Sequence, residues 1–137
     1  MLHHVSLGVA DLQRSADFYD AVLGELGYVR VWADDTAVGY GRAGGGDKLA
    51  IKLRSADAIA PGPGFHLAFS APDRHSVRRF HEAALRHGGR DNGAPGLRPH
   101  YGPAYFAAFV ADPDGHRIEA VINTPDQSLD LASAARL

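Results

Sequence analysis

An internal repeat constrains the fold of this chain more than any other feature. When the sequence is shifted by 62 residues, its first half lies over its second half without a gap, and His4 falls on His66. The further matched pairs are Asp11 with Asp73, Phe18 with Phe80, Ala21 with Ala83, Leu23 with Leu85 and Gly27 with Gly89. Because the repeat joins a strand pattern, a helix start and a terminating glycine, we infer two copies of one module.

Each module is predicted to begin with a strand and then a helix. Apolar residues alternate with small or polar residues over 4–9 and again over 65–70, which is the period of a half-buried strand. His4 and His66 therefore lie on the face opposite the apolar one. Asp11 and Asp73 are the expected N-caps of the two helices, and glycines after each apolar stripe end them.

Three shorter strands are expected after each helix, so the element order is βαβββ twice. We place them at 28–33, 36–41 and 48–54 in the first module. In the second module a short or distorted strand precedes strands at 105–110 and 117–122. The predicted division is module one at 1–54, a linker at 55–63, module two at 64–122 and a C-terminal tail at 123–137, in one compact α+β domain.

Composition excludes several classes of function. The formal net charge of −2 gives no basic field for nucleic acid and no polybasic membrane patch. No apolar run approaches the ~20 residues that cross a bilayer, and the first residues do not resemble a signal peptide. Cysteine is absent, which excludes disulfides and thiol catalysis. We expect a cytoplasmic protein.

The last strand of each module supplies the candidate site. We align Ile51-Lys52-Leu53 with Ile118-Glu119-Ala120, at an offset of 67, and place the five extra residues in the loop 91–103. Lys52 and Glu119 are then predicted to be equivalent positions, as His4 and His66 are. Two such pairs converging on one axis give a four-cornered site.

Two segments resemble a known family. The string 4–12, HVSLGVADL, and the string 109–119, FVADPDGHRIE, look like the opening and closing motifs of the vicinal oxygen chelate superfamily. Its members include glyoxalase I, bleomycin- and fosfomycin-resistance proteins and extradiol dioxygenases. The resemblance covers 2–122 and implies paired βαβββ modules forming a cup-shaped, mostly antiparallel eight-strand sheet around a divalent metal, with the helices outside. It also implies a homodimer.

The resemblance further implies a ligand set. His4, His66 and Glu119 match three of the four family positions and would form a two-histidine, one-carboxylate face for Fe, Ni, Zn or Mn. Lys52 departs from the fourth position, because a protonated ammonium cannot bind a metal. The alternative is that an ion pair between Lys52 and Glu119 replaces the metal, which leaves the protein with no cofactor.

Two functions follow from these alternatives. The first is an enzyme of the lyase, isomerase or dioxygenase type, in which Glu119 or Lys52 manages protons during catalysis. The second is a metal-free protein that binds or sequesters a small molecule. Lys52 itself has several candidate roles: a general base, a Schiff-base former, an anion holder, or a solvated lysine whose strand we have placed in the wrong register.

The loop 91–103 is the remaining candidate feature. Thirteen residues without an obvious element are typical of a lid or binding loop, and Arg98, His100 and Tyr101 are its candidate substrate-binding residues. The alternative is a rigid exposed connection. We assign no role to the other histidines, expecting 75, 81 and 87 on the exposed side of the second helix and 116 in a turn. The sequence leaves open whether Trp32 and Tyr40 line the cup or the core.

Overall fold

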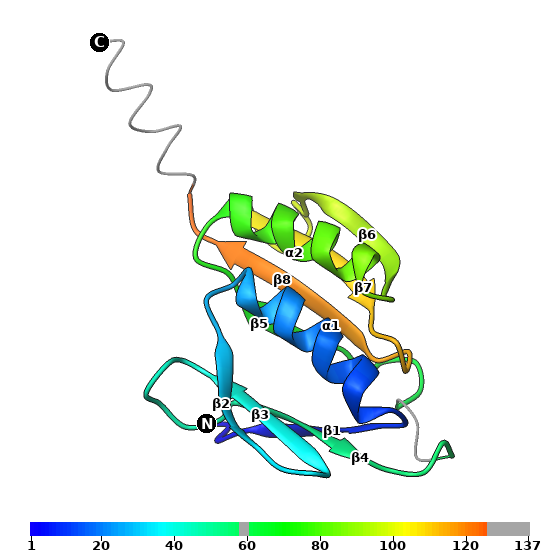
Figure 1. The fold of residues 1–137 in the computed structure, drawn as a ribbon. Helices are drawn as coiled ribbons and strands as arrows, with labels where there is room; N and C mark the ends of the chain where they lie inside the picture. The colour runs from blue at the N-terminus through cyan, green and yellow to red at the C-terminus, as the bar shows by residue number, and fades with distance from the viewer. Residues whose placement is uncertain (58–60, 126–137) are drawn as a thin grey trace, which may run out of the picture.

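A computed structural model describes residues 1–57 and 61–125 of the chain (Figure 1). The elements of the first module are β1 (Val5–Val9), α1 (Leu12–Gly24), β2 (Val29–Ala33), β3 (Ala37–Gly41) and β4 (Leu49–Leu53). Those of the second module are β5 (Leu67–Ser70), α2 (Arg74–Arg86), β6 (Arg90–Leu97), β7 (Tyr105–Ala111) and β8 (Arg117–Asn123). The predicted α+β fold with two tandem βαβββ modules is confirmed.

The two modules have the same sheet topology. The strand order is β1-β4-β3-β2 in the first sheet and β5-β8-β7-β6 in the second. In each sheet the first and last strands of the module pair in parallel, and the other neighbours are antiparallel. The histidine-bearing end of each module and its last strand are therefore neighbours.

The strands do not form one eight-stranded sheet within the chain, so that expectation is wrong for the part of the chain that the structure describes. Two four-stranded sheets are present instead, with β1 and β5 each at an edge. A physical reason lies at the outer side of β1. The Gly8 carbonyl accepts a hydrogen bond from His116 Nε2 at 2.8 Å, and the Ala10 N–H donates to Asp114 Oδ1 at 3.1 Å. The β7–β8 turn thus occupies the end of the β1 edge.

The helix boundaries confirm the repeat. Both helices have 13 residues, and their first and last positions are 62 apart in the sequence. The Asp11 carboxylate accepts from the Arg14 N–H and the Asp73 carboxylate from the Ser76 N–H, so both predicted N-caps are present. Past their C-terminal ends, Gly27 and Gly88 adopt φ values of 90° and 94°, which favour glycine.

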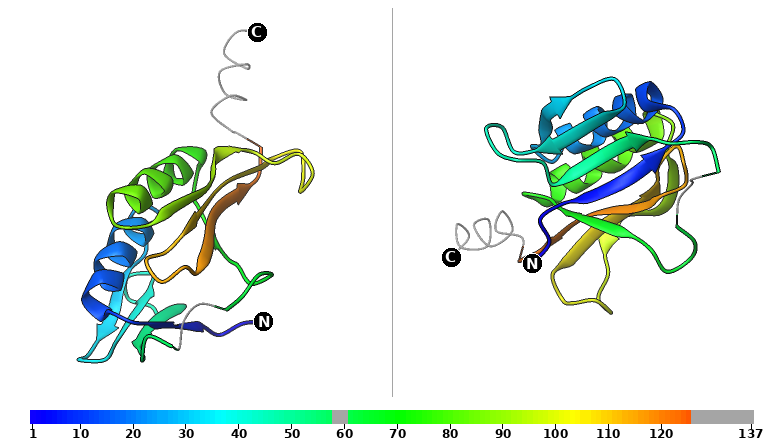
Figure 2. Two further views of the ribbon diagram at one scale, coloured as in Figure 1. Left: turned by 90° about the vertical axis from the view of Figure 1, so that its right-hand side faces the viewer. Right: turned by 90° about the horizontal axis from the view of Figure 1, so that it is seen from below.

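Each helix covers the apolar face of its own sheet, and the two helices pack against each other on one side of the molecule (Figures 1 and 2). The shared core includes Leu7 and Ile51 from the first sheet and Phe80 and Ile118 from the second module. At this junction the buried Tyr19 hydroxyl donates to Asp112 Oδ2 at 2.6 Å. Burial raises the pKa of Tyr19, and the Asp112 charge adds to the shift, so the phenol stays protonated as the donor.

The segment that we expected to be a long loop is largely a strand. β6 runs from Arg90 to Leu97, so the connection before β7 is shorter than the predicted 91–103. The pairing of β6 with β7 shifts register between Asp91 and Gly93 and again between Gly93 and Gly96. These irregularities agree with the expected distortion, and the edge position of β6 tolerates Pro95.

Two of the predicted segments lie partly outside the described residues. Positions 58–60 of the linker and 126–137 of the tail are among those that the structure does not describe. No helix in the described part of the chain is long and apolar enough to cross a membrane.

Candidate functional site

His66 and Glu119 form the centre of the candidate site. His66 precedes β5, Glu119 lies in β8, and the two strands pair in parallel. His66 Nε2 is 2.6 Å from Glu119 Oε1, within a hydrogen bond that the imidazole donates. The His66 side chain is 53% exposed and the Glu119 side chain 2% exposed. A buried carboxylate thus meets an imidazole that is open to solvent.

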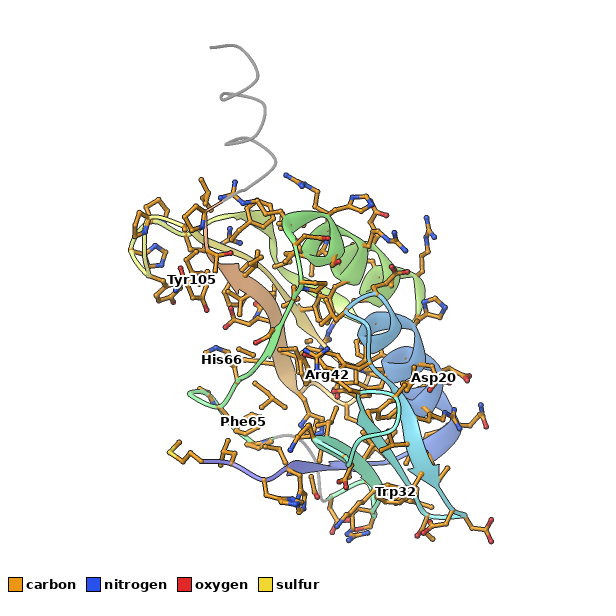
Figure 3. The ribbon with its side chains drawn as sticks, turned by 90° about the vertical axis from the view of Figure 1, so that its left-hand side faces the viewer. Asp20, Trp32, Arg42, Phe65, His66 and Tyr105 are labelled. Carbon is orange, nitrogen blue, oxygen red and sulfur yellow. The ribbon has the colours of Figure 1, made fainter. Side chains whose placement is uncertain are left out.

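Tyr105 holds the second oxygen of this carboxylate. Tyr105 lies at the start of β7 (Figure 3). Its hydroxyl donates to Glu119 Oε2 at 2.7 Å. Burial raises the pKa of Tyr105 to about 12, and the hydrogen bond and charge of Glu119 add to the shift. The phenol is therefore protonated at neutral pH and fixes the orientation of the carboxylate. Tyr105 was not among the site residues predicted from the sequence. The alternation of β7 could have indicated it, because Tyr105 shares a face with Phe109, which pairs with Glu119.

An open pocket of about 200 Å³ borders the exposed side of His66. Of the three residues expected to bind substrate, Tyr101 lines this pocket, and its ring lies 5.2 Å from that of Tyr105. Arg98 stacks over Phe109 at 5.3 Å, and His100 stacks on Tyr101 at 4.1 Å. Tyr101 therefore lies in the pocket wall, and Arg98 and His100 each contact an aromatic ring of that wall.

His4 lies apart from His66 and Glu119 within the chain. It is exposed, its Nδ1 is 2.8 Å from His3 Nδ1, and it borders a different cavity, of about 240 Å³, between the modules. The structure therefore does not bring the predicted four corners together in a single chain.

Lys52 lies on the same face of the first sheet as Ser6 and Gly8, as predicted from the sequence. Its strand neighbours are Gly8 in β1 and Ala37 in β3, so it points away from the face that α1 covers. Among the described residues Lys52 makes no ion pair with Glu119, whose oxygens are bonded to His66 and Tyr105. The proposed replacement of a metal by an ion pair between these two residues is not present in the chain.

The strand register corrects the equivalence of Lys52 and Glu119. Glu119 pairs with Ala68, whose counterpart 62 residues earlier is Ser6, and Ser6 pairs with Ala50. Ala50 is therefore the counterpart of Glu119, and Lys52 is the counterpart of Val121. Our alignment was wrong by two residues, a slip that leaves a side chain on the same face of the sheet.

The sequence contained a signal for the correct register. At an offset of 69, Gly46, Lys48 and Leu49 fall on Gly115, Arg117 and Ile118. A glycine followed by a basic and an aliphatic residue thus marks the start of both last strands. With Ala50 at the fourth corner, the predicted ligand set would have three members, because an alanine cannot bind a metal.

The donor atoms of His66 and Glu119 fit a metal ion only in part. An imidazole nitrogen and a carboxylate oxygen in contact are suited to a divalent transition metal, which would replace the proton that they share. Within residues 1–57 and 61–125, however, no group of three or more His, Cys, Asp or Glu side chains could hold a metal ion. His66 and Glu119 are thus two potential ligands, and a metal site would require a third group from elsewhere.

Comparisons with known proteins decide the family. Residues 1–120 match the Glyoxalase/Bleomycin resistance protein/Dioxygenase superfamily. This chain belongs to that superfamily. No match to this superfamily member was found among curated proteins.

Solved structures of the superfamily share its fold. A glyoxalase/bleomycin resistance protein from Albidiferax ferrireducens T118 is 31% identical, with a TM-score of 0.71 over 88% of this chain and 97% of that one. A glyoxalase-related enzyme from Fulvimarina pelagi is 26% identical, with a TM-score of 0.69 over 90% and 88%. The fosfomycin resistance protein FosX from Mesorhizobium loti is 22% identical, with a TM-score of 0.64 over 94% and 97%, and supports the fold alone.

Proposed function

We propose that this superfamily member binds a divalent metal through His66 and Glu119, with His4 of a second copy as the third ligand, and acts enzymatically on a small molecule with adjacent oxygens. The reaction would be of the lyase, isomerase or dioxygenase type. The observation that carries the proposal is the 2.6 Å contact between an exposed imidazole and a buried carboxylate at the edge of an open pocket.

The sheet edges support a site shared between two copies. β1 follows His4, β5 follows His66, and both strands end their sheets in the described part of the chain. Edge strands expose unpaired backbone groups that favour pairing with another chain. The β7–β8 turn occupies only the Gly8–Ala10 end of the β1 edge. Pairing the rest of β1 with β5 of another copy would bring His4 toward His66 and join the two sheets that are separate in the single chain.

His66, Glu119 and Tyr105 would have different roles in this reaction. A bound metal would polarise adjacent oxygens of the substrate as a Lewis acid. The Tyr105 hydroxyl binds Glu119 Oε2 and so fixes the carboxylate, which leaves Oε1 directed at His66 Nε2. The metal would lie between Oε1 and Nε2. Tyr101 and Phe109 supply aromatic walls for the substrate. Glu119 Oε1 is the group placed to accept a substrate proton when it is not bound to a metal.

Elemental analysis tests the metal. Protein purified after growth in medium with added Fe, Ni, Zn and Mn is expected to carry about one equivalent of metal per chain. His66→Ala and Glu119→Gln are expected to lose it, and His75→Ala, an exposed histidine on α2, serves as the control that keeps it. A wild-type content below about a tenth of an equivalent would favour the metal-free binding protein instead, because the hydrogen bond between His66 and Glu119 satisfies both groups without a metal.

A further inference from the structure

The face of the first sheet that points away from α1 is built almost entirely from small residues. The pairings Ser6 with Ala50, Gly39 with Ala50, and Ala37 and Gly8 with Lys52 place all of these positions on one face. Two large side chains rise from this floor, Lys52 from β4 and Trp32 from β2. Ala37 and Ala50 in this floor are themselves buried, at 7% and 1% exposed, so a ligand on this face would meet Trp32 and Lys52.

The indole of Trp32 lies directly over the backbone of this floor. It pairs with Gly39, and a Cβ atom at position 39 would overlap Nε1, Cε2 and Cδ1 of the indole. Glycine inside a strand is expected where another group approaches the backbone this closely. Trp32 nevertheless remains 37% exposed, so part of the ring is open to solvent. In Figure 3 it lies on the first sheet, away from His66 and Tyr105 on the second.

Lys52 supplies a positive charge on the same face of the sheet, one rung along from the Gly39 position that the indole covers. Ala37 pairs with Lys52, and Gly39 pairs with Ala50. These two pairs are adjacent on the same face of the sheet and lie roughly 7 Å apart along the strands. The paired positions of this face in β1, β3 and β4 include no acidic residue, and no ion pair of Lys52 is present among the described residues. A half-buried lysine and a partly exposed indole, both on the first sheet, complement a planar ring that carries an anion.

We propose that Trp32 and Lys52 form a ligand platform for planar aromatic carboxylates, in which the ring stacks on the indole and the carboxylate meets the ammonium. The proposal rests on the proposed function in taking this platform as the part of the substrate site that the first module supplies. It assigns Lys52 to anion binding rather than to proton transfer or metal replacement. It also gives Gly39 a role, since any side chain there would displace the indole from the sheet.

Fluorescence provides the test, because Trp32 is the single tryptophan of the chain. The full-length protein is titrated with benzoate in the presence of a chelator, so that no metal contributes, and with benzamide as the uncharged match. Benzoate is expected to change the tryptophan emission saturably and to bind more tightly than benzamide. Lys52→Met is expected to weaken benzoate binding roughly tenfold, as the loss of one charged hydrogen bond implies.

Lys48→Met is the matched control. Lys48 is the only other lysine, and its ammonium is directed at the His3 carbonyl, 3.5 Å away, at the start of the same strand. This variant is expected to bind benzoate as the wild type does. Three results would overturn the platform: no saturable change with benzoate, equal affinity for benzamide, or equal weakening by Lys48→Met.

The two proposals fail separately. If the metal site is wrong, elemental analysis finds no metal while benzoate binding in chelator persists. If the platform is wrong, benzoate does not bind although His66→Ala still abolishes the metal content. Equilibrium dialysis of Trp32→Leu with benzoate adds a measurement that does not depend on fluorescence, and loss of binding is the expected result.

Discussion

At the scale of single residues, Glu119 has the surroundings that matter most. Its side chain is nearly closed to water, yet both oxygens are satisfied, one by His66 and one by Tyr105. A buried charge is tolerated only when it is hydrogen-bonded. The carboxylate of Glu119 therefore depends on these two partners to remain buried. The same two bonds leave its orientation fixed before any ligand arrives.

Tyr105→Phe should therefore destabilise the protein without removing the ring. The variant leaves Glu119 Oε2 without its donor, and an unsatisfied buried acceptor costs about 1–3 kcal/mol of unfolding free energy. Tyr101→Phe is the control, because Tyr101 makes ring contacts and its side chain is exposed. Urea unfolding of both variants measures the difference. Equal stability of Tyr105→Phe and Tyr101→Phe would contradict the role given to the Tyr105 hydroxyl.

At the scale of elements, the helix starts are the most securely encoded features. The Asp73 carboxylate accepts hydrogen bonds from the N–H and hydroxyl of Ser76, at 2.7 and 2.8 Å. The Ser76 N–H is the main reason that the pKa of Asp73 lies below its usual range. A lowered carboxyl pKa stabilises the folded state above the unfolded pKa, and this contribution disappears as pH falls through the folded pKa.

Asp73→Ala is thus expected to cost about 1 kcal/mol at neutral pH. The deficit relative to wild type should shrink as pH falls below about 4, where the unfolded aspartate begins to protonate. Asp73→Asn, which keeps a capping oxygen without a titrating group, should retain most of the stability. Urea unfolding between neutral and acidic pH measures all three proteins. A deficit that does not change with pH would mean that the ionised cap is not its source.

Local sequence signals predicted the β1–α1 and β5–α2 units correctly but did not predict the register of the last strands or the presence of β6. N-caps, strand alternation and terminating glycines act within a few residues, so the offset of 62 between β1–α1 and β5–α2 was correct. The predicted register of β4 relative to β8 was wrong, because offsets of 67 and 69 both keep the apolar residues on one face of the sheet. Only pairing with β1 and β5 separates them. β6 was missed because its glycines and proline are typical of loops, and pairing with β7 holds the strand despite them.

At the scale of the whole molecule, the arrangement of the two modules separates His4 from His66. No pattern in the sequence could reveal this, since the repeat makes both histidines equivalent whether the modules pair within a chain or between chains. Side-chain contacts decide it: the turn 112–116 binds α1 and the end of β1, through Asp112, Asp114 and His116. The modules are thereby fixed with their histidines in different cavities.

Mixing two inactive variants tests whether the site is shared. His4→Ala lacks the third ligand, and the double variant His66→Ala with Glu119→Gln lacks the other two. Neither should bind metal alone. After the two are unfolded and refolded together, mixed dimers contain one complete site, so metal binding should reappear in the dimer fraction. The mixture binds nothing if each chain builds its own site, and size-exclusion chromatography with elemental analysis separates the outcomes.

The proposed sharing of the metal site between two chains has a thermodynamic consequence. A ligand set divided between two chains makes metal binding and subunit association parts of one equilibrium, so each must strengthen the other by the same factor. Metal added to dilute protein would then shift the balance from monomer to dimer by mass action. Chelation would reverse it. Activity per chain would fall on dilution, and the concentration of the protein itself would act as a regulator.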